Sequence, residues 1–260
     1  MNPFLLSAVA AVAVNGAFFA YAAAKKTDVV TDLSYSLSFA LVAATFLASG
    51  RASGIVALVP AALTVVWAVR LGAYLFGRIR ATKVDHRFDG MRENPLKFAR
   101  FWILQAVAVA VILLPVSSAV AAAERLRVFG AFQLTGAAVW LAGFAFEVVA
   151  DAQKSAFKKA GNAGFIASGL WKYSRHPNYF GESLLWWGLF VYVAPTLRGA
   201  LWLAALGPAF ITVLLLFISG IPLLEKSADA KYGADPAYVE YKRQTSVFVP
   251  LPRRPAIRSS

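Results

Sequence analysis

The chain has 260 residues, of which 59% are hydrophobic and 15% are charged, and its formal net charge is +13. Soluble globular chains carry about 25% charged residues, so this composition excludes a soluble Rossmann or barrel enzyme and also a disordered chain. The absence of cysteine excludes disulfides, a thiolate nucleophile and sulfur-ligated metal. The basic residues lie between apolar stretches and form no separate basic domain, which argues against a nucleic-acid partner.

Apolar segments that approach the length needed to cross the roughly 30 Å core of a bilayer recur along the chain. They predict an all-α, polytopic membrane protein with about seven transmembrane helices, in which residues 1–260 form a single domain. The expected spans cover residues 3–24, 33–49, 54–77, 101–121, 129–150, 183–198 and 200–221. Gly207-Pro208 and Gly220-Ile221-Pro222 are expected to bend or end the last span. The first span also resembles a signal peptide, although no Lys or Arg precedes it.

Lys and Arg are distributed unevenly between the connections. Residues 25–32, 78–100, 151–182 and those after 222 carry two, seven, five and seven of them, whereas the opposite connections carry four in all. Because basic loops stay in the cytoplasm, we expect the N-terminus outside and the C-terminus in the cytoplasm. This orientation places every long polar connection on the side where NADPH and S-adenosylmethionine are found.

Ionisable side chains inside a membrane span are costly and therefore indicate candidate sites. Arg70 and Tyr74 lie one turn apart on the third span, and Tyr74 could donate a proton or hydrogen bond to a bound carbonyl. The alternative is a structural tyrosine in the aromatic belt. Asp32 opens the second span and is the acid best placed to enter the bilayer. Arg87 belongs to the basic connection after Tyr74 and is a candidate cofactor contact.

Glu147 and Asp151 lie four residues apart near the cytoplasmic end of the fifth span and so share a helix face. Since like charges at this spacing repel, a cationic or hydrogen-bond-donating group is expected beside them. That group is either a protein side chain or a ligand. The alternative is that both carboxylates are solvated in the headgroup region.

The connection at residues 168–182 is the most informative stretch, because it gathers five polar side chains where the chain re-enters the membrane. They are Arg175, His176, Asn178, Tyr179 and Glu182. Pro177 fixes the backbone there, and Gly181 permits close approach of a ligand or a helix. Such a group could bind a phosphorylated cofactor, with Arg175 on a phosphate. The alternative for an Arg-His pair at this position is anchoring to lipid headgroups.

The C-terminal part places tyrosines among basic residues after the last span, including Tyr232 and Tyr241, and these could cover a cofactor. An amphipathic interfacial helix explains the same composition. With two histidines, His86 and His176, and no cysteine, no zinc signature is present. A Gly-x-Gly-x-x-Gly turn is also absent, so a dinucleotide would not be held in a Rossmann fold.

From about Arg70 to Pro250 the chain resembles the bacterial integral membrane proteins of the steroid 5α-reductase family. The most specific segment is Gly169-Leu-Trp-Lys-Tyr-Ser-Arg-His-Pro-Asn-Tyr-Phe-Gly-Glu182 with Trp186-Trp187-Gly188. In that family the matching Asn and Gly-Glu pair lie in the NADPH pocket, which implies the same for Asn178, Gly181 and Glu182.

Other cofactor contacts follow from the same resemblance. Glu147 and Asp151 look like the family's Asn-to-Asp pair, and Lys158 begins a segment similar to its basic phosphate-binding turn. Lys231-Tyr232-Gly233 with Tyr241 resembles the tail of related sterol reductases, where tyrosines contact the cofactor. Isoprenylcysteine carboxyl methyltransferases and phospholipid methyltransferases carry similar segments that bind S-adenosylmethionine.

Steroid 5α-reductases also use a Gln-Glu pair on the second span, whose Glu acts with the Tyr of the third span on the 3-keto group. Thr31-Asp32 stands in that place here, which leaves the substrate open to another lipid-soluble enone. The resulting prediction is an inner-membrane enzyme that binds NADPH from the cytoplasm and delivers hydride to a conjugated C=C. Tyr74 is expected to stabilise the enolate and Asp32 to orient Tyr74.

Two rival hypotheses remain open. One is a methyltransferase that uses S-adenosylmethionine on a membrane-embedded substrate. The other is a non-catalytic transporter or assembly factor, which would need a polar path through the bundle. The outer half of the spans offers little for such a path beyond Asn15, Gln105 and Gln133.

Overall fold

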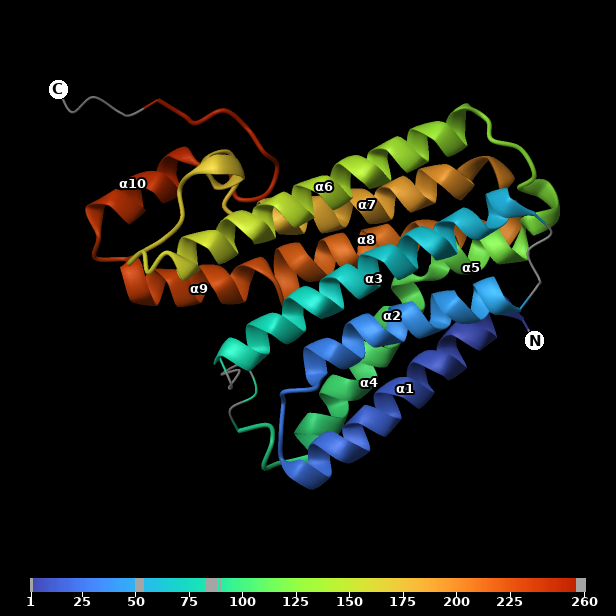
Figure 1. The fold of residues 1–260 in the computed structure, drawn as a ribbon, viewed down its shortest axis with the longest axis horizontal. Helices are drawn as coiled ribbons and strands as arrows, with labels where there is room; N and C mark the ends of the chain where they lie inside the picture. Colours follow the sequence, from blue (N-terminus) through green and yellow to red (C-terminus); the bar gives the residue numbers. More distant parts are fainter. Residues whose placement is uncertain (1, 50–53, 83–87, 89, 256–260) are drawn as a thin grey trace. The chain divides into compact units, whose positions relative to one another are not determined.

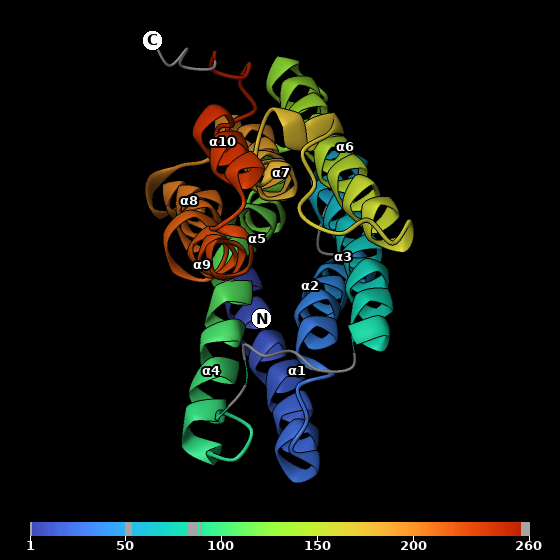
Figure 2. The same ribbon diagram turned by 90° about the vertical axis from the view of Figure 1, so that its left-hand side faces the viewer.

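The computed structural model describes residues 2–49, 54–82, 88 and 90–255. Within these residues the regular elements are all helical, and the only extended pairing is an isolated parallel bridge between Ser174 and Ser246. The prediction of an all-α chain is therefore confirmed. Figure 1 shows the order of the helices along the chain, and Figure 2 shows them from the side.

The chain divides into two compact units. Unit 1 comprises Met1–Leu134 and Leu189–Gly207, and unit 2 comprises Thr135–Gly188 and Pro208–Ser260. Three of the described helices, α6 (Ala131–Lys159), α7 (Pro177–Val193) and α8 (Leu206–Val213), have residues in both units. The expectation that residues 1–260 form a single domain stays a prediction.

In the described part of unit 1, the main elements are α-helices and short 3₁₀ turns. The helices are α1 (Pro3–Lys25), α2 (Thr31–Ala48), α3 (Ile55–Thr82), α4 (Pro95–Ile112) and α5 (Leu114–Ala121), and the turns are Ala123–Arg125, Ala194–Thr196 and Gly199–Ala205. α2 packs along α3, and α1 packs on both α2 and α4. Phe39 and Trp67, both fully buried, join α2 to α3 by an edge-to-face contact with ring centroids 5.1 Å apart.

A buried polar network also joins the helices of unit 1. The amide Nε2 of Gln105 on α4 donates to Asn15 Oδ1 on α1 (2.7 Å) and to Ser34 Oγ on α2 (2.8 Å), and Asn15 Nδ2 donates to Ser38 Oγ (3.0 Å). Gln133 donates to the backbone carbonyl of Tyr192. Hydrogen bonds between polar side chains hold membrane helices together. Asn15, Gln105 and Gln133 thus have structural partners.

Unit 2 contains most of α6 and α7 and the C-terminal helices. The remaining elements are the 3₁₀ turn Gly169–Lys172, α8 (Leu206–Val213), the π-helix Leu214–Ile218, α9 (Ile221–Tyr232) and α10 (Pro236–Gln244). α6 and α7 run side by side (Figures 1 and 2), and glycines line their contact. A Cβ atom at Gly143 would lie 2.5 Å from the backbone nitrogen of Leu185, and one at Gly188 would lie 2.6 Å from that of Trp140. Only glycine permits this approach.

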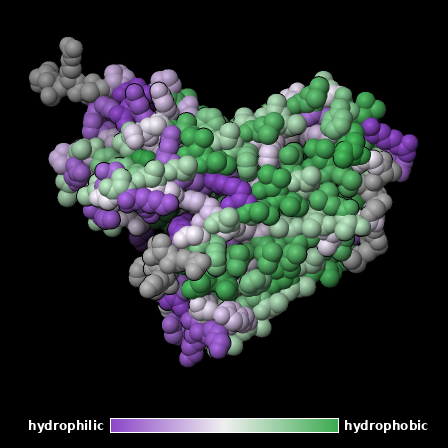
Figure 3. Space-filling model, viewed as in Figure 1, coloured by the Kyte–Doolittle hydropathy of each residue, from purple (hydrophilic) through white to green (hydrophobic). Residues whose placement is uncertain are grey.

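Among the residues that the structure describes, six segments are long and apolar enough to cross a membrane. They are Pro3–Lys25, Thr31–Ala48, Ile55–Ile79, Pro95–Ile112, Ala131–Lys159 and Gly199–Tyr232. On the face seen in Figure 3, hydrophobic side chains cover the surface over long stretches, and hydrophilic ones gather toward its margins. The chain is thus a multi-pass membrane protein, whereas the expected count of seven spans and the orientation stay predictions.

The structure differs from the expected spans at several boundaries. The expected span at 101–121 starts earlier, at Pro95, and breaks at Leu113 into α4 and α5, because Pro115 has no N–H to continue the helix. α6 extends to Lys159, well beyond residue 150. The last segment agrees with expectation, because its helix is interrupted at Ser219 and Gly220, between the π-helix and α9, where Gly220-Ile221-Pro222 was expected to bend or end the span.

Candidate functional site

Most of the predicted site residues lie in unit 2, where α6 crosses the first turns of α7. Gly181 is buried on α7, and a Cβ atom there would lie 2.6 Å from both the backbone nitrogen of Glu147 and the carbonyl oxygen of Gly143 on α6. Gly181 was expected to permit close approach of a ligand or a helix, and in the structure it permits the close approach of α6. This contact fixes the polar side chains of the two helices beside each other.

Three carboxylates are buried at this crossing. Glu147 and Asp151 are 2% exposed and Glu182 is 8% exposed. Asn178, in the first turn of α7, donates its amide N–H to Asp151 Oδ1 at 3.2 Å. A hydrogen-bond donor was expected beside the acidic pair, and the structure brings Asn178 to it. Burying a carboxylate is costly unless it is hydrogen-bonded, and the Asn178 amide offsets part of that cost at Asp151.

Arg175 is held in place by protein partners. Its Nε donates to Glu225 Oε1 (3.1 Å), its Nη2 lies 3.0 Å from Glu225 Oε2, and its Nη1 donates to the carbonyl of Lys242 (2.6 Å). The sequence marked Arg175 as a phosphate ligand. The observed contacts join the start of α7 to α9 and α10, and a phosphate contact of Arg175 stays a prediction.

His176 shares the same carboxylate. Its Nε2 lies 2.9 Å from Glu225 Oε1, and its ring stacks on Tyr179 with centroids 5.9 Å apart. Burial lowers the pKa of His176 below 6.5 despite the neighbouring Glu225, and Lys154 and Arg175 act in the same direction as burial. His176 is therefore neutral at pH 7. Together these contacts place His176 and Tyr179 at the start of α7.

The two predicted C-terminal tyrosines surround Phe165. Tyr241 stacks on the Phe165 ring (5.2 Å) and donates its hydroxyl to the carbonyl of Trp171 (2.8 Å), while Tyr232 donates to the carbonyl of Gly164 (2.8 Å). Burial is the main cause that raises the pKa of Tyr241 above its ordinary value. Both hydroxyls thus tie the C-terminal helices to the segment between α6 and α7.

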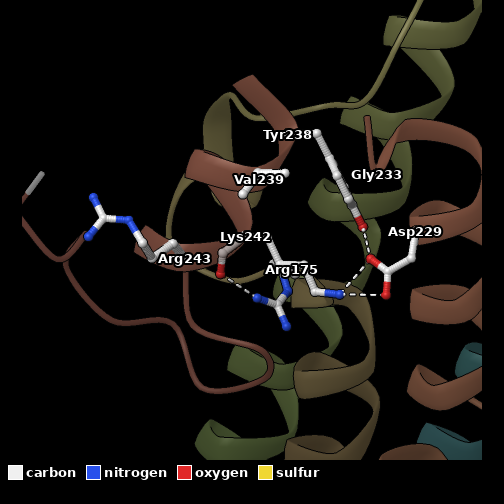
Figure 4. Close-up of a pocket in the computed structure, with 7 residues that line it drawn as sticks. All are labelled: Arg175, Asp229, Gly233, Tyr238, Val239, Lys242 and Arg243. Carbon is white, nitrogen blue, oxygen red and sulfur yellow. Dashed lines mark hydrogen bonds and ion pairs between the residues drawn. The ribbon is translucent and has the colours of Figure 1, made fainter. Parts of the chain in front are cut away.

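A groove of about 600 Å³ opens beside this network, lined by Arg175, Asp229, Gly233, Tyr238, Val239, Lys242 and Arg243 (Figure 4). Asp229 accepts from Lys242 Nζ (2.5 and 2.7 Å) and from the Tyr238 hydroxyl (3.0 Å). Sequence reasoning missed Glu225, Asp229 and Lys242 as members of the network. The four-residue spacing of Glu225 and Asp229 could have indicated them, because it places the two acids one turn apart on a helix.

The two remaining cofactor candidates are placed differently. Lys158 is exposed in the last turn of α6, one residue before the helix ends. Arg87 lies outside the described residues. Along α6, however, Glu147, Asp151, Lys154 and Lys158 follow one another at intervals of four, three and four residues and so form a single stripe. Along this stripe burial decreases toward the helix end, from buried Glu147 and Asp151 through half-buried Lys154 to exposed Lys158.

The two proposed catalytic residues lie in unit 1. The guanidinium carbon of Arg70 lies 5.4 Å from the centroid of the Tyr74 ring, one turn away on α3. Asp32, in the first turn of α2, accepts from Arg78 Nη2 at 2.6 Å, and Arg78 lies one turn beyond Tyr74. Sequence reasoning did not single out Arg78 as a partner of Asp32. The ion pair anchors the start of α2 to the turn of α3 that follows Tyr74.

Comparison with known proteins identifies the family to which the chain belongs. The profile of the family described as Protein of unknown function (DUF1295) matches residues 18–245. A curated relative is the "Uncharacterized protein C594.04c" of Schizosaccharomyces pombe, which is 25% identical over 228 residues that cover 74% of this chain. The aligned region is 63% of the length of that relative, so the chain corresponds to less than two thirds of it. No solved structure matches. The chain belongs to the DUF1295 family, a family of membrane proteins related to steroid 5α-reductase.

Proposed function

We propose that this protein is an NADPH-dependent membrane reductase that transfers hydride to the C=C of a lipid-soluble enone, with 3-oxo-Δ4 steroids as one substrate class. The observation that supports the cofactor most directly is the crossing of α6 and α7. There the buried carboxylates of Glu147 and Asp151 face Asn178, and Gly181 brings the two backbones together.

The donors and acceptors at this crossing fit the chemistry of NADPH. Glu147 and Asp151 would accept hydrogen bonds from ribose hydroxyls or from the carboxamide, and the amide of Asn178 can both donate and accept. Lys154 and Lys158 continue the same stripe toward the helix end and would meet the phosphates. Lys154 also lies 4.8 Å from the centroid of the Trp171 ring, which holds it near the segment before α7.

When bound, NADPH would supply hydride to the β-carbon of the enone. Negative charge then builds on the carbonyl oxygen of the substrate, and Tyr74 is the proposed donor to that oxygen. Arg70, over the Tyr74 ring, would stabilise negative charge on the phenol oxygen as the proton is given up. Asp32 would act as a positioning residue, because its ion pair with Arg78 fixes α2 against the turn after Tyr74.

The distribution of basic residues supports a location in the bacterial inner membrane with the cofactor site facing the cytoplasm. Lys158 and the whole 160–176 connection belong to one of the basic connections. In this orientation the cofactor would enter from the cytoplasm and the apolar substrate from the bilayer.

Turnover of purified protein tests the proposal. NADPH carrying deuterium at its reactive carbon is supplied with a 3-oxo-Δ4 steroid and with a linear enone, and the products are analysed by mass spectrometry. We expect deuterium at the β-carbon of at least one product and loss of that product in the Tyr74→Phe variant. Methylated product from S-adenosylmethionine, with no deuterium transfer from NADPH, would contradict the proposal.

A further inference from the structure

The C-terminal strap, residues 245–255, follows α10 and lies against the segment that leads into α7. The backbone N–H of Arg175 donates to the carbonyl of Ser246 (2.8 Å), and the backbone N–H of Leu251 donates to that of Tyr173 (3.1 Å). Because α7 begins at Pro177, these bonds hold the strap beside the first turn of that helix.

Exposed and half-buried side chains alternate along residues 247–251 of the strap. Phe248 points toward the protein and packs edge-to-face on Phe180 of α7, with ring centroids 5.7 Å apart. Val247, Val249 and Leu251 point outward and are 39%, 46% and 51% exposed. The strap therefore presents a row of three apolar side chains at the level where α7 starts.

The strap and the segment that it lies against carry charges of one sign. Neither residues 160–176 nor the strap contains Asp or Glu, while together they carry Lys172, Arg175, Arg253 and Arg254. Lys172 and Arg254 are exposed, and Tyr173 beside them is 42% exposed. Arg253 fastens the strap, because its guanidinium donates to the carbonyl of Ala167 (3.0 Å).

We propose that the outward row Val247, Val249 and Leu251, together with Lys172 and Arg254, inserts into the headgroup region of an anionic phospholipid leaflet. Apolar side chains flanked by cations bind the interface of anionic membranes, and exposed aromatics prefer the same depth. Phe180 ties the row to the first turn of α7, an apolar helix that would enter the bilayer at this point. This proposal is independent of the proposed reductase activity.

The absence of cysteine makes the test direct, since one introduced cysteine is the only labelling site. Val249→Cys and Leu251→Cys are each labelled with a nitroxide and reconstituted in vesicles of phosphatidylcholine alone or of equal parts phosphatidylcholine and phosphatidylglycerol. Val239→Cys is the matched control, because Val239 is 52% exposed but lies on α10 beside the Glu240–Arg243 ion pair. Each variant must unfold at the temperature of the parent in detergent.

The expected result is a several-fold higher ratio of oxygen to nickel-chelate accessibility at residues 249 and 251 than at 239. Phosphatidylglycerol should raise this ratio at 249, and adding Arg254→Gln should remove the increase. Equal water accessibility at 239 and 249 in both lipid mixtures would overturn the proposal. Dipolar broadening between labels on two molecules would also overturn it, by assigning the row to contact with a second copy of the chain.

Discussion

Arg175 and Glu225 form a two-point ion pair between the segment that enters α7 and the second turn of α9, with N–O distances of 3.1 and 3.0 Å. Both side chains are mostly buried, at 11% and 18% exposure. The pair joins residues that are fifty positions apart and places the start of α7 relative to the C-terminal helices. This geometry requires arginine, because a planar guanidinium can donate two hydrogen bonds to one carboxylate and the ammonium group of lysine lacks this fork.

Breaking this pair should therefore destabilise the protein. Arg175→Lys and Glu225→Gln are each expected to cost about 1.5–3 kcal/mol, the range for hydrogen bonds to charged groups. Arg243→Gln, which removes an exposed ion pair with Glu240, is the matched control and should cost at most about 1 kcal/mol. Thermal unfolding in detergent measures all three. Equal effects of Arg175→Lys and Arg243→Gln would show that the buried pair adds nothing.

The crossing of α6 and α7 depends on Gly181. Gly181→Ala would place a methyl group 2.6 Å from two backbone atoms of α6, so the helices must separate. Overpacking of this kind costs about 1–3 kcal/mol. Gly16→Ala, in α1 with no atom within 4 Å of the added methyl, should be neutral or slightly stabilising. A Gly181→Ala protein as stable as the parent would contradict the tight crossing.

The sequence predicted the all-α class and most of the spans because hydropathy and length carry that information locally. It also marked Asn178, Gly181 and Asp151, which the structure brings to one crossing. It did not predict the partner of Arg175. An Arg in a polar loop is equally compatible with a phosphate and with a carboxylate, and only the packing of α9 decides that Glu225 reaches it.

Helix boundaries were also less accessible to sequence reasoning. α6 continues to Lys159 because good helix formers such as Gln153, Lys154 and Lys158 follow its apolar part, which hydropathy alone does not record. The break at Leu113 required weighing Pro115 against a continuous apolar run. The ion pair of Asp32 with Arg78 was also not predicted, and the role of Asp32 in orienting Tyr74 stays a prediction.

Stability should depend on pH through His176. The pKa of His176 in the folded protein lies below 6.5, so near that pH the unfolded chain binds more protons than the folded one. The neutral His176 ring therefore makes its full contribution to the free energy of unfolding above pH 6.5. This contribution is lost as the pH falls through the pKa of the folded protein. Melting temperatures measured over this window should decline on acidification, and less steeply in His176→Gln. Parallel declines of the two proteins would contradict the assignment.

Cofactor affinity should depend on Asn178. Asn178→Ala removes an amide that pairs with Asp151, and we expect NADPH binding to weaken roughly tenfold, about 1.4 kcal/mol. Asn162→Ala, an exposed asparagine just after α6, is the control and should bind NADPH normally. Isothermal titration in detergent gives both affinities. Equal affinities would remove Asn178 from the cofactor site.

Tyr74→Phe should separate binding from chemistry. Loss of the hydroxyl removes the proposed donor to the carbonyl oxygen, so turnover should fall by about 10²–10³ while NADPH affinity is unchanged. The same kinetic experiment on Tyr21→Phe, an exposed tyrosine of α1, controls for the loss of a hydroxyl in unit 1. Normal turnover of Tyr74→Phe would assign this tyrosine a structural role.

Binding of NADPH by unit 2 is best tested by the thermal shift of purified protein with NADPH, NADH and S-adenosylmethionine. A ligand that binds only the folded state stabilises it by about 2.7 kcal/mol at one hundred times its dissociation constant. We expect a clear shift with NADPH, a smaller one with NADH, and an NADPH shift reduced by about half in Asn178→Ala. Stabilisation by S-adenosylmethionine alone would contradict it.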